Sequence, residues 1–377
     1  MRIDLFCRVI DNWGDAGVCW RLARQLVRER GARVRLWIDQ PQVLAAWQDE
    51  RAALTTLQIC TWSDAVNWSE IAPADAVIEA FACDIPADYV RNMAQAEIKP
   101  RWLNLEYLSA EAWVEGAHLL PSPQSGGLTK LFFFPGFTEK TGGLLRERDL
   151  LTVRDRFVAQ YPRYWSDLTG FEWDDDALAI SLFGYEDMPL QSWLPALIEG
   201  ETPVQLAVTY GKASEALKRA WSALNLPQSN AAQWHAGQLS VRFLPMLSQG
   251  EYDQLLWSAD INMVRGEDSL VRALWAGKPL VWDIYKQNDG VHWDKLKAFT
   301  QRYGASGDEG VAQLNDAFTL CWNDSQVAAS ELTQQWLRYV RAMPALTQHA
   351  RDVAAHLAQQ DDLVTQLLRH LSVAEKP

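Results

Sequence analysis

The sequence IDLFCRVIDNWGDAGVCWRLARQLVRERGARVRLWI, residues 3–38, decides the fold. An apolar run over residues 3–10 predicts a buried strand, and apolar residues at helical spacing follow over residues 17–30. Gly31 ends this helix, and a second apolar strand pattern begins at Val34. A strand, a helix and a second strand in this order form a right-handed crossover, so we expect the two strands to pair in a parallel sheet.

The same alternation of strands and helices continues along the chain. Further strands are predicted at residues 76–81, 102–107, 131–134, 177–183, 204–209, 239–244, 261–264 and 280–284. After Val291 the pattern is wholly helical. Two Rossmann-like α/β domains that face a cleft, closed by a C-terminal helix that returns to the first domain, are the plan of the GT-B glycosyltransferases, and we expect this fold. The fold alone does not give the function, because pairs of Rossmann-like domains serve many chemistries.

The chain has 377 residues, more than one hydrophobic core usually organises, so two domains are expected. A charged and aromatic segment that ends in Asp174-Asp175-Asp176 precedes a new apolar strand, and we place the domain boundary there. The first domain is predicted to cover residues 1–176, completed by a C-terminal helix at residues 355–377, and the second to cover residues 177–354.

Composition narrows the classes of partner. The net charge is -13 at pH 7, which disfavours the broad basic surface that nucleic-acid binding requires. No apolar run is long enough to span a bilayer, and the N-terminus opens directly into a strand pattern rather than a signal peptide. The five cysteines contain no CxxC pair, so neither a disulfide framework nor a zinc site is indicated. We therefore expect a cytoplasmic protein with no nucleic-acid or membrane partner.

The turn Asp11-Asn12-Trp13-Gly14-Asp15-Ala16-Gly17 lies where the first strand gives way to the first helix, a place where open α/β sheets bind ligands. It departs from the dinucleotide fingerprint GxGxxG, because Asn12 takes the place of the first glycine and acids flank the turn. The carboxylates of Asp11 and Asp15 suit the recognition of a cation or the deprotonation of an acceptor. A structural alternative is that Asp15 only caps the helix.

The stretch Arg265-Gly266-Glu267-Asp268-Ser269 occupies the equivalent place in the second half of the chain. The Arg265 guanidinium, the Ser269 hydroxyl and the backbone amides near Asp268 suit a diphosphate at the start of a helix. Glu267 would then accept a hydrogen bond from a sugar or ribose hydroxyl. The structural alternative is a helix cap in which Arg265 pairs with Glu267 or Asp268 at the surface.

These two motifs, together with the turn Phe183-Gly184-Tyr185-Glu186, closely resemble the EarP family of bacterial protein-arginine rhamnosyltransferases, which modify elongation factor P. The resemblance extends along essentially the whole chain. It implies an inverting GT-B enzyme that transfers L-rhamnose from dTDP-β-L-rhamnose to one arginine of elongation factor P. The modified factor then supports translation of polyproline stretches. Trp13 is the one local departure, because the family often carries a smaller aromatic residue there.

The resemblance also implies roles for individual residues. Asp11 and Asp15 become the acceptor-side carboxylates, with Asp15 the better candidate for the general base and Asp11 the alternative. Glu267 supports the donor, and these three are the predicted catalytic residues. The predicted acceptor-binding residues are Asp11, Asn12, Trp13, Gly14 and Asp15. The predicted donor-binding residues are Phe183, Tyr185, Leu247, Gln249, Arg265, Glu267, Asp268 and Ser269, with Leu247 and Gln249 at the thymine base.

No cofactor or metal is expected, because Arg265 and the start of the following helix supply positive potential to a leaving diphosphate. His292 is a further donor-site candidate.

One alternative is a GT-B enzyme with a different nucleotide-sugar donor and a lipid or polysaccharide acceptor, which a basic or amphipathic membrane face would favour. Another is a non-catalytic nucleotide-sugar sensor, which would need the donor motif without the acids Asp11 and Asp15.

Overall fold

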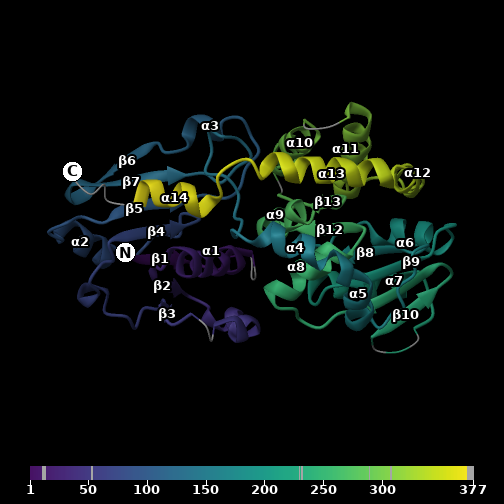
Figure 1. Ribbon diagram of the computed structural model, residues 1–377, viewed down its shortest axis with the longest axis horizontal. Helices are drawn as coiled ribbons and strands as arrows, with labels where there is room; N and C mark the ends of the chain where they lie inside the picture. The colour runs from purple at the N-terminus through teal and green to yellow at the C-terminus, as the bar shows by residue number, and fades with distance from the viewer. Residues whose placement is uncertain are drawn as a thin grey trace. The chain divides into compact units, whose positions relative to one another are not determined.

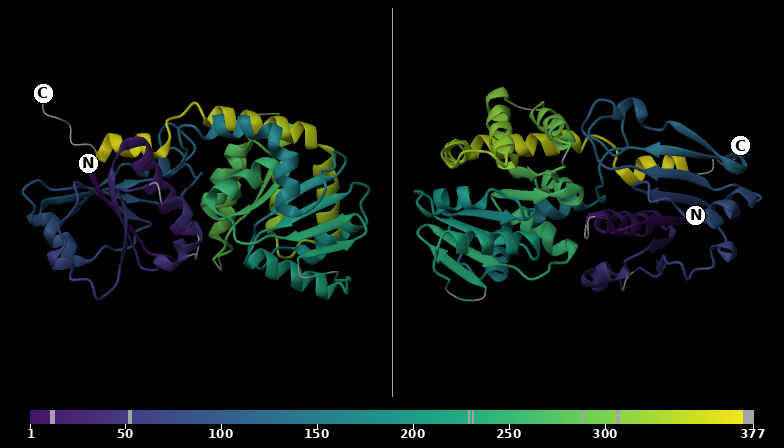
Figure 2. Two further views of the ribbon diagram at one scale, coloured as in Figure 1. Left: turned by 60° about the horizontal axis from the view of Figure 1, so that its bottom comes forward. Right: turned by 180° about the vertical axis from the view of Figure 1, so that it is seen from behind.

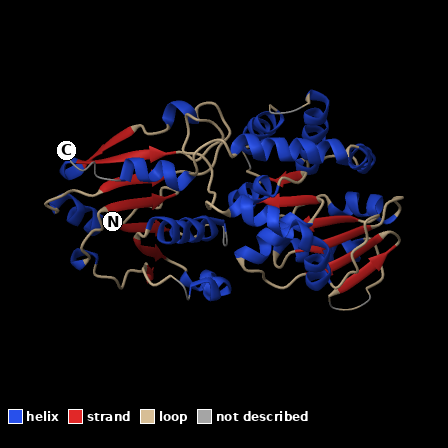
Figure 3. Ribbon diagram, in the orientation of Figure 1, coloured by secondary structure: helices blue, strands red, loops and turns tan. Residues whose placement is uncertain are grey.

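The computed structural model describes residues 1–10, 14–51, 54–228, 230, 232–287, 289–305 and 308–371. The chain divides into two compact units: Met1–Arg148 and Gln360–Pro377 form unit 1, and Asp149–Gln359 form unit 2. Each unit is built around one β-sheet with helices on its faces (Figures 1 and 3). The predicted fold class of two Rossmann-like α/β units is therefore confirmed.

Unit 1 contains a seven-stranded sheet in the order β3-β2-β1-β4-β5-β7-β6. Neighbouring strands pair in parallel except at the edge, where β6 is antiparallel to β7. The chain order reverses between β1 and β4, and open α/β sheets bind ligands at the carboxyl ends of the strands at such a point. The strands are β1 (Arg2–Cys7), β2 (Arg33–Ile38), β3 (Leu57–Thr61), β4 (Ala76–Ala80), β5 (Arg101–Leu105), β6 (Pro121–Gln124) and β7 (Leu128–Phe133).

Successive residues of β1 point to opposite faces of this sheet. Leu5 packs in one core with Leu22 of α1 and Leu367 of α14, whereas Phe6 packs in the other with Trp68 of η2 and Tyr89 of α2. The C-terminal α14 lies beside the sheet of unit 1 in every view (Figures 1 and 2), which confirms the predicted return of the chain. The helices and 3-10 turns of unit 1 are α1 (Gly14–Arg30), η1 (Pro41–Arg51), η2 (Trp68–Glu70), α2 (Ala87–Gln95), α3 (Val114–Ala117), η3 (Ser125–Gly127) and α14 (Leu363–Leu371).

Unit 2 contains a six-stranded sheet in the order β10-β11-β9-β8-β12-β13. It is parallel except for β10, which is antiparallel to β11 at the edge. The adjacent strands β8, β12 and β13 therefore present their carboxyl ends at one edge of the sheet. The strands are β8 (Leu178–Leu182), β9 (Val204–Val208), β10 (Gln233–Ala236), β11 (Leu239–Phe243), β12 (Ile261–Arg265) and β13 (Leu280–Asp283).

Helices cover both faces of this second sheet. On one face Trp193 of α6 contacts Trp322 of α11 and Trp336 of α12, with ring centroids 5.1 and 5.3 Å apart. On the other face Trp165 of α5 and Leu255 of α8 share a smaller core. The helices and 3-10 turn of unit 2 are α4 (Leu150–Phe157), η4 (Val158–Gln160), α5 (Tyr161–Thr169), α6 (Leu190–Ile198), α7 (Lys212–Ala223), α8 (Gln249–Ser258), α9 (Gly266–Ala276), α10 (Val291–Gly304), α11 (Glu309–Asn323), α12 (Ala329–Arg341) and α13 (Met343–Leu357).

The division between the units differs from the expected boundary at residue 176. Unit 2 begins at Asp149, so α4 and α5 belong to it rather than to the first domain. The reason is packing: Trp165 of α5 is fully buried, and its indole donates a hydrogen bond to Gln205 Oε1 of β9 at 2.6 Å. Phe157 of α4 likewise contacts Trp257 of α8, with ring centroids 5.6 Å apart. At the C-terminus the chain joins unit 1 at Gln360, a few residues later than the expected 355.

Candidate active site

Asp15 lies in the first turn of α1, after the carboxyl end of β1. Its side chain is only 4% exposed. The carboxylate Oδ2 accepts a hydrogen bond from the Ile10 backbone amide at 2.9 Å, and Oδ1 accepts one from the Tyr107 hydroxyl at 3.3 Å. Both oxygens are thereby held in place. The geometry gives Asp15 an orientation that a simple surface acid would not have.

Of the predicted acceptor-binding residues, Gly14 and Asp15 lie within the described part of the chain. Asp11, Asn12 and Trp13 lie outside the described residues, and Gly14 is the first residue of α1. Asp15 is therefore the one predicted catalytic residue of unit 1 whose surroundings the structure describes.

An aromatic pair stands next to Asp15. Phe81 follows β4 and Tyr107 follows β5, and their rings stack with centroids 4.4 Å apart and planes 15° apart. Phe81, Ala82 and Asp84 have φ angles of 57°, 50° and 52°, in the left-handed region that residues with side chains seldom adopt. Such strain concentrates at functional sites. Tyr107 is 39% exposed, so part of this aromatic pair is open to solvent beside the carboxylate.

Arg265 is the last residue of β12 in unit 2, and its side chain is 7% exposed. The guanidinium carbon lies 4.6 Å from the ring centroid of Phe183 and 4.8 Å from that of Tyr185. Such contacts stabilise a cation on an aromatic face. Its Nη1 is buried and has no hydrogen-bond partner among the described atoms. A buried, oriented guanidinium nitrogen without a partner is suited to an anionic ligand.

The residues that follow Arg265 begin α9. Gly266 has a φ of 65°, which glycine adopts without steric cost and which allows the strand to turn directly into the helix. The Ser269 hydroxyl donates a hydrogen bond to the Arg265 carbonyl. Glu267 Oε1 lies 3.1 Å from Lys295 Nζ of α10, and Asp268 is half-buried. Arg265 is thus not the exposed partner of Glu267 that the helix-cap alternative required.

Gln249 and Leu247 lie at the start of α8. Gln249 is buried at the first position of the helix, and Ser248 before it closes a reciprocal cap with Glu251. Tyr252, one turn further along, contacts Phe183, with ring centroids 5.7 Å apart. Phe183 therefore contacts both Tyr252 of α8 and the Arg265 guanidinium. Tyr185 also lies against this guanidinium, so the structure brings together three of the predicted donor residues, Phe183, Tyr185 and Arg265.

Two parts of this arrangement were missed by sequence reasoning. In unit 1, Tyr107 bonds to Asp15; in unit 2, Asp283 at the end of β13 accepts a hydrogen bond from the Tyr185 amide through Oδ2 at 2.6 Å. Burial is the largest cause that raises the pKa of Asp283, to about 7. The available signal was position: both residues stand at or just after the carboxyl end of a predicted strand, where ligand-binding side chains gather.

His292 and the cysteines give no sign of metal binding. The His292 ring is buried, and its Nδ1 accepts a hydrogen bond from the Gln287 backbone amide at 3.1 Å. All five cysteines are free thiols. Within the described ranges, no group of three or more His, Cys, Asp and Glu side chains is arranged to hold a metal ion. In the same ranges no helix has the length and apolar character needed to cross a bilayer.

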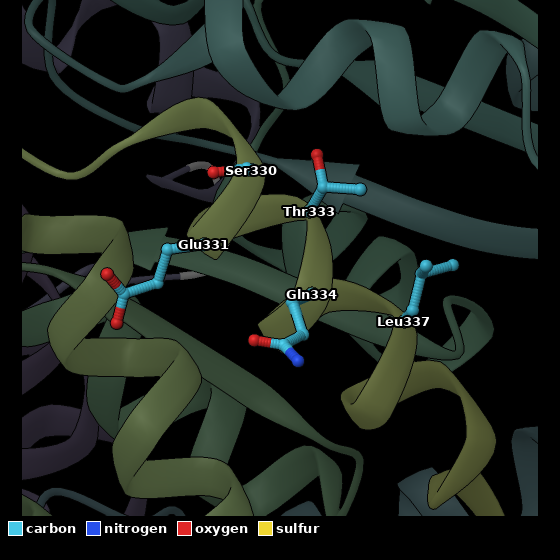
Figure 4. Close-up of a pocket in the computed structure, with 5 residues that line it drawn as sticks. All are labelled: Ser330, Glu331, Thr333, Gln334 and Leu337. Atoms are coloured by element: carbon cyan, nitrogen blue, oxygen red, sulfur yellow. The ribbon is translucent and has the colours of Figure 1, made fainter.

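A surface hollow of about 530 Å³ lies along α12 (Figure 4). Its lining residues all come from that one helix: Ser330, Glu331, Thr333, Gln334 and Leu337. None of them lies at the carboxyl end of a strand, and Glu331 is the one titratable group among them. This hollow therefore has neither the position nor the chemistry of the candidate site.

A buried ion pair joins α8 and α9, the two helices that carry predicted donor residues. Arg272 of α9 donates to both carboxylate oxygens of Asp253 of α8, at 2.9 and 2.7 Å, and both side chains are buried. We expect Asp253→Ala to reduce the free energy of unfolding by about 3–5 kcal/mol, because it leaves a buried guanidinium without its counter-charge. Denaturant unfolding measures this. The double variant Asp253→Leu/Arg272→Met, which removes both charges, should lose much less, and an equal loss would contradict this explanation.

The profile of the family described as Elongation-Factor P (EF-P) rhamnosyltransferase EarP matches residues 3–372. A protein-arginine rhamnosyltransferase of Pseudomonas putida is 46% identical over 376 residues, which cover 97% of each chain. The Pseudomonas aeruginosa relative of the same name is 41% identical with the same coverage. A Neisseria meningitidis relative is 37% identical and covers 90% of this chain and 94% of its own.

Two solved structures are similar along nearly the whole chain. One, described as the structural basis for EarP-mediated arginine glycosylation of translation elongation factor EF-P, has a TM-score of 0.67 and 33% identity, and covers 98% of this chain and 97% of its own. The other is an α-glucosyltransferase in complex with UDP and DNA, with a TM-score of 0.52 and 10% identity, which covers 98% of each chain and shows the fold alone. The first resemblance, like the motifs at Asp15 and Arg265, extends through both units. The chain belongs to the EarP family of elongation-factor P rhamnosyltransferases.

Proposed function

We propose that this protein is an inverting glycosyltransferase that transfers L-rhamnose from dTDP-β-L-rhamnose to an arginine side chain of elongation factor P, and thereby supports translation of polyproline stretches. The observation that carries the proposal is whole-length membership of the family, since relatives with up to 46% identity are protein-arginine rhamnosyltransferases. The Asp15 carboxylate and the Arg265 guanidinium are the two kinds of group that this reaction needs, a base for the acceptor and a cation for the leaving diphosphate.

The donor is proposed to bind in unit 2. The buried guanidinium of Arg265 has an Nη1 without a hydrogen-bond partner in the described part of the chain, and the start of α9 adds the partial positive charge of a helix N-terminus. Both suit a diphosphate. Gln249 and Leu247, at the start of α8, are proposed to contact the base, and Glu267, in the first turn of α9 and ion-paired with Lys295, is proposed to accept a hydrogen bond from a sugar or ribose hydroxyl. The same positive groups would stabilise the charge that develops on dTDP as it leaves.

The acceptor is proposed to bind in unit 1. An arginine guanidinium stays protonated in water, so its nitrogen must lose a proton as the bond to the anomeric carbon forms. Asp15 is the proposed general base: its carboxylate is oriented by Ile10 and Tyr107 and can hold the guanidinium by charge-assisted hydrogen bonds before it accepts the proton. Asp11 is proposed to share the orienting role. The freed proton goes to a carboxylate, and the electron pair of the broken C–O bond goes to dTDP.

Transfer is expected to proceed at the full rate in excess EDTA. The proposed leaving-group stabilisers are Arg265 and the start of α9, which act without a cation. Initial rates of transfer are to be measured with EDTA, and with added Mg²⁺ or Mn²⁺. A loss of rate in EDTA that a divalent ion restores would contradict this mechanism.

The folded N-terminal domain of elongation factor P is expected to be a far better acceptor than a short linear peptide that carries the same arginine. One or two carboxylates cannot single out one arginine among all those of the cell by charge alone, so recognition must extend over the folded surface around it. Initial rates on the isolated N-terminal domain of the factor and on the peptide measure the difference. Comparable rates on both would show that the local sequence suffices.

The proposed donor and stereochemistry are tested together. Titration calorimetry with dTDP-β-L-rhamnose, dTDP-glucose, UDP-glucose and GDP-mannose is expected to show the tightest binding for the first. Nuclear magnetic resonance of the modified factor is then expected to show an α-linked rhamnose, the product of inversion at the anomeric carbon. Tighter binding of another sugar nucleotide would show that dTDP-β-L-rhamnose is not the donor. A β-linked product would show that the reaction does not invert the anomeric carbon.

A further inference from the structure

Asp283 lies beside Arg265 at the proposed donor site. The two residues are direct neighbours in the parallel pairing of β12 and β13, and each ends its strand. Asp283 is 1% exposed. Its Oδ1, like Nη1 of Arg265, is buried without a hydrogen-bond partner among the described atoms. The ends of these adjacent strands thus hold two buried polar atoms of opposite charge, each without a hydrogen-bond partner among the described atoms, whereas buried polar atoms in proteins are nearly always hydrogen-bonded.

The other oxygen of Asp283 holds the turn that follows β8. Oδ2 accepts the Tyr185 backbone amide at 2.6 Å. The turn fits closely around it, because a Cβ added at Gly184 would lie 2.9 Å from this oxygen and 2.1 Å from Met188 Sδ. Tyr185 in turn covers the Arg265 guanidinium at 4.8 Å. The carboxyl group therefore sets the position of the aromatic ring that orients the diphosphate-binding cation.

Charged groups face Asp283 from three directions. Lys286, on its own strand's continuation, and Arg265 on β12 lower its pKa, and Asp187 on the turn after β8 raises it. Lys286 and Asp187 form an ion pair at 2.8 Å and largely offset each other. Burial outweighs these charges and raises the pKa to about 7. The nearby pairs Glu186 with Lys212 and Glu267 with Lys295, each at 3.1 Å, are internally neutral.

We propose that Asp283 is a positioning residue of the donor site, which holds the Tyr185 turn against Arg265 and takes up one proton when a diphosphate binds. This rests on the proposed function in that it takes a nucleoside diphosphate as the ligand of Arg265. Without a bound diphosphate, the ionised form of Asp283, which predominates above about pH 7, balances the Arg265 charge. Once an anionic diphosphate occupies Nη1, that balance is no longer needed, and a second negative charge nearby disfavours the ionised form of Asp283.

The sign of the effect follows from linkage. A ligand that raises the pKa of a group binds together with a proton, so its affinity falls as pH rises through the pKa of the free site, here about 7. The fall approaches about tenfold per pH unit until the pKa of the bound state is reached. The donor itself adds no such term, because a sugar nucleotide is a diphosphate diester without an ionisation near neutral pH. Free dTDP has one and is not a suitable probe.

Titration calorimetry of the full-length protein with dTDP-β-L-rhamnose, from about pH 6 to pH 8.5 in buffers of different ionisation enthalpy, counts the protons taken up. We expect the wild type to take up close to one proton above neutral pH. Asp283→Asn keeps the oxygen that accepts the Tyr185 amide but cannot titrate, so it should bind the donor with little pH dependence and no proton uptake. Asp283→Ala, which loses the anchor, should bind about tenfold or more weakly at every pH.

Asp260→Asn is the matched control. Asp260 is another carboxyl whose pKa burial raises, and its Oδ2 accepts the Ala179 amide at 3.0 Å, but it lies at the opposite end of β12. Its replacement should leave proton uptake unchanged. Binding without proton uptake in the wild type, or uptake that survives in Asp283→Asn, overturns the proposal. No binding of dTDP-β-L-rhamnose by a folded wild-type protein would overturn the donor assignment first, and the role of Asp283 with it.

Discussion

Replacing Asp15 with asparagine is expected to lower the rate of rhamnosyl transfer by about 10²- to 10⁴-fold, the usual contribution of a general base. Asparagine has nearly the same shape and keeps an oxygen that can accept the Ile10 amide, which Asp15 Oδ2 accepts at 2.9 Å. What it loses is the charge that holds the acceptor guanidinium and the basicity that removes its proton. A mass-shift assay on elongation factor P measures the rate, and titration calorimetry with the sugar nucleotide measures donor affinity, which should stay unchanged.

Asp39→Asn is the matched control for this variant. Asp39 follows β2 at the same edge of the sheet, and its Oδ1 accepts the Val9 backbone amide at 3.0 Å, one residue before Ile10. It thus supports the same loop without a proposed catalytic role, so its replacement should leave most of the activity. If Asp15→Asn loses donor affinity as much as turnover, or if Asp39→Asn is equally inactive, Asp15 acts through the fold and is not the general base.

Replacing Arg265 with alanine is expected to weaken the binding of dTDP by about 1.5–3 kcal/mol, roughly ten- to a hundredfold. The guanidinium is the cation proposed for the diphosphate, and it is held between Phe183 and Tyr185 at 4.6 and 4.8 Å. Arg265→Lys should recover only part of the affinity, because an ammonium neither stacks on two rings nor donates in the fork geometry of a guanidinium. Calorimetric titration with dTDP at one pH measures all three proteins.

Arg219→Ala tests whether any nearby positive charge would serve. Arg219 is exposed, and it donates to the Glu186 carbonyl of the same turn at 3.2 Å. Its removal should change dTDP affinity by less than a factor of about two, as expected for an exposed charge. Unchanged affinity in Arg265→Ala, in a protein that unfolds like the wild type, would remove Arg265 from the diphosphate site.

The central strands were predictable from sequence, as was the edge strand β13, whereas the edge strands β3, β6 and β10 were missed. Strands such as β1 and β12 are buried on both faces and read as continuous apolar runs. The missed strands β6 and β10 are antiparallel edge strands of four residues each, with the sequences PSPQ and QWHA. Proline is tolerated in an edge strand, so its presence in PSPQ does not prevent pairing. A strand of four residues contains too few apolar residues to give a recognisable alternating pattern. The missed β3, LQICT, also lies at an edge and is partly exposed.

The domain boundary needed tertiary information. The segment that holds α4 and α5 is rich in charged residues, which suggested a linker before residue 177. Three aromatic residues, Phe157, Tyr164 and Trp165, instead attach these helices to unit 2, and Phe157 contacts Tyr164 with ring centroids 5.3 Å apart. The burial of a few large aromatic side chains is enough to attach such a segment to a domain even when most of its residues are polar. The average composition of the segment does not reveal these few residues.

The candidate site was found where it depends on strand ends and missed where it depends on contacts. Asp15 and Arg265 each follow an apolar strand and precede a helix, so position and chemistry marked them together. Tyr107 and Asp283 also stand at strand ends, but their importance comes from bonds to Asp15 and to the Tyr185 amide, residues far away in sequence. A local sequence pattern cannot predict a hydrogen bond between residues that lie so far apart in the sequence.

Intact-mass analysis of elongation factor P after incubation with this protein and dTDP-β-L-rhamnose measures the proposed transfer itself. We expect the factor to gain the mass of one deoxyhexosyl residue, which fragmentation places on a single arginine, and to gain it about 10²- to 10⁴-fold more slowly when Asp15→Asn replaces the wild type. An unmodified factor, after incubation with wild-type protein that binds the sugar nucleotide, would show that the protein is not the proposed rhamnosyltransferase.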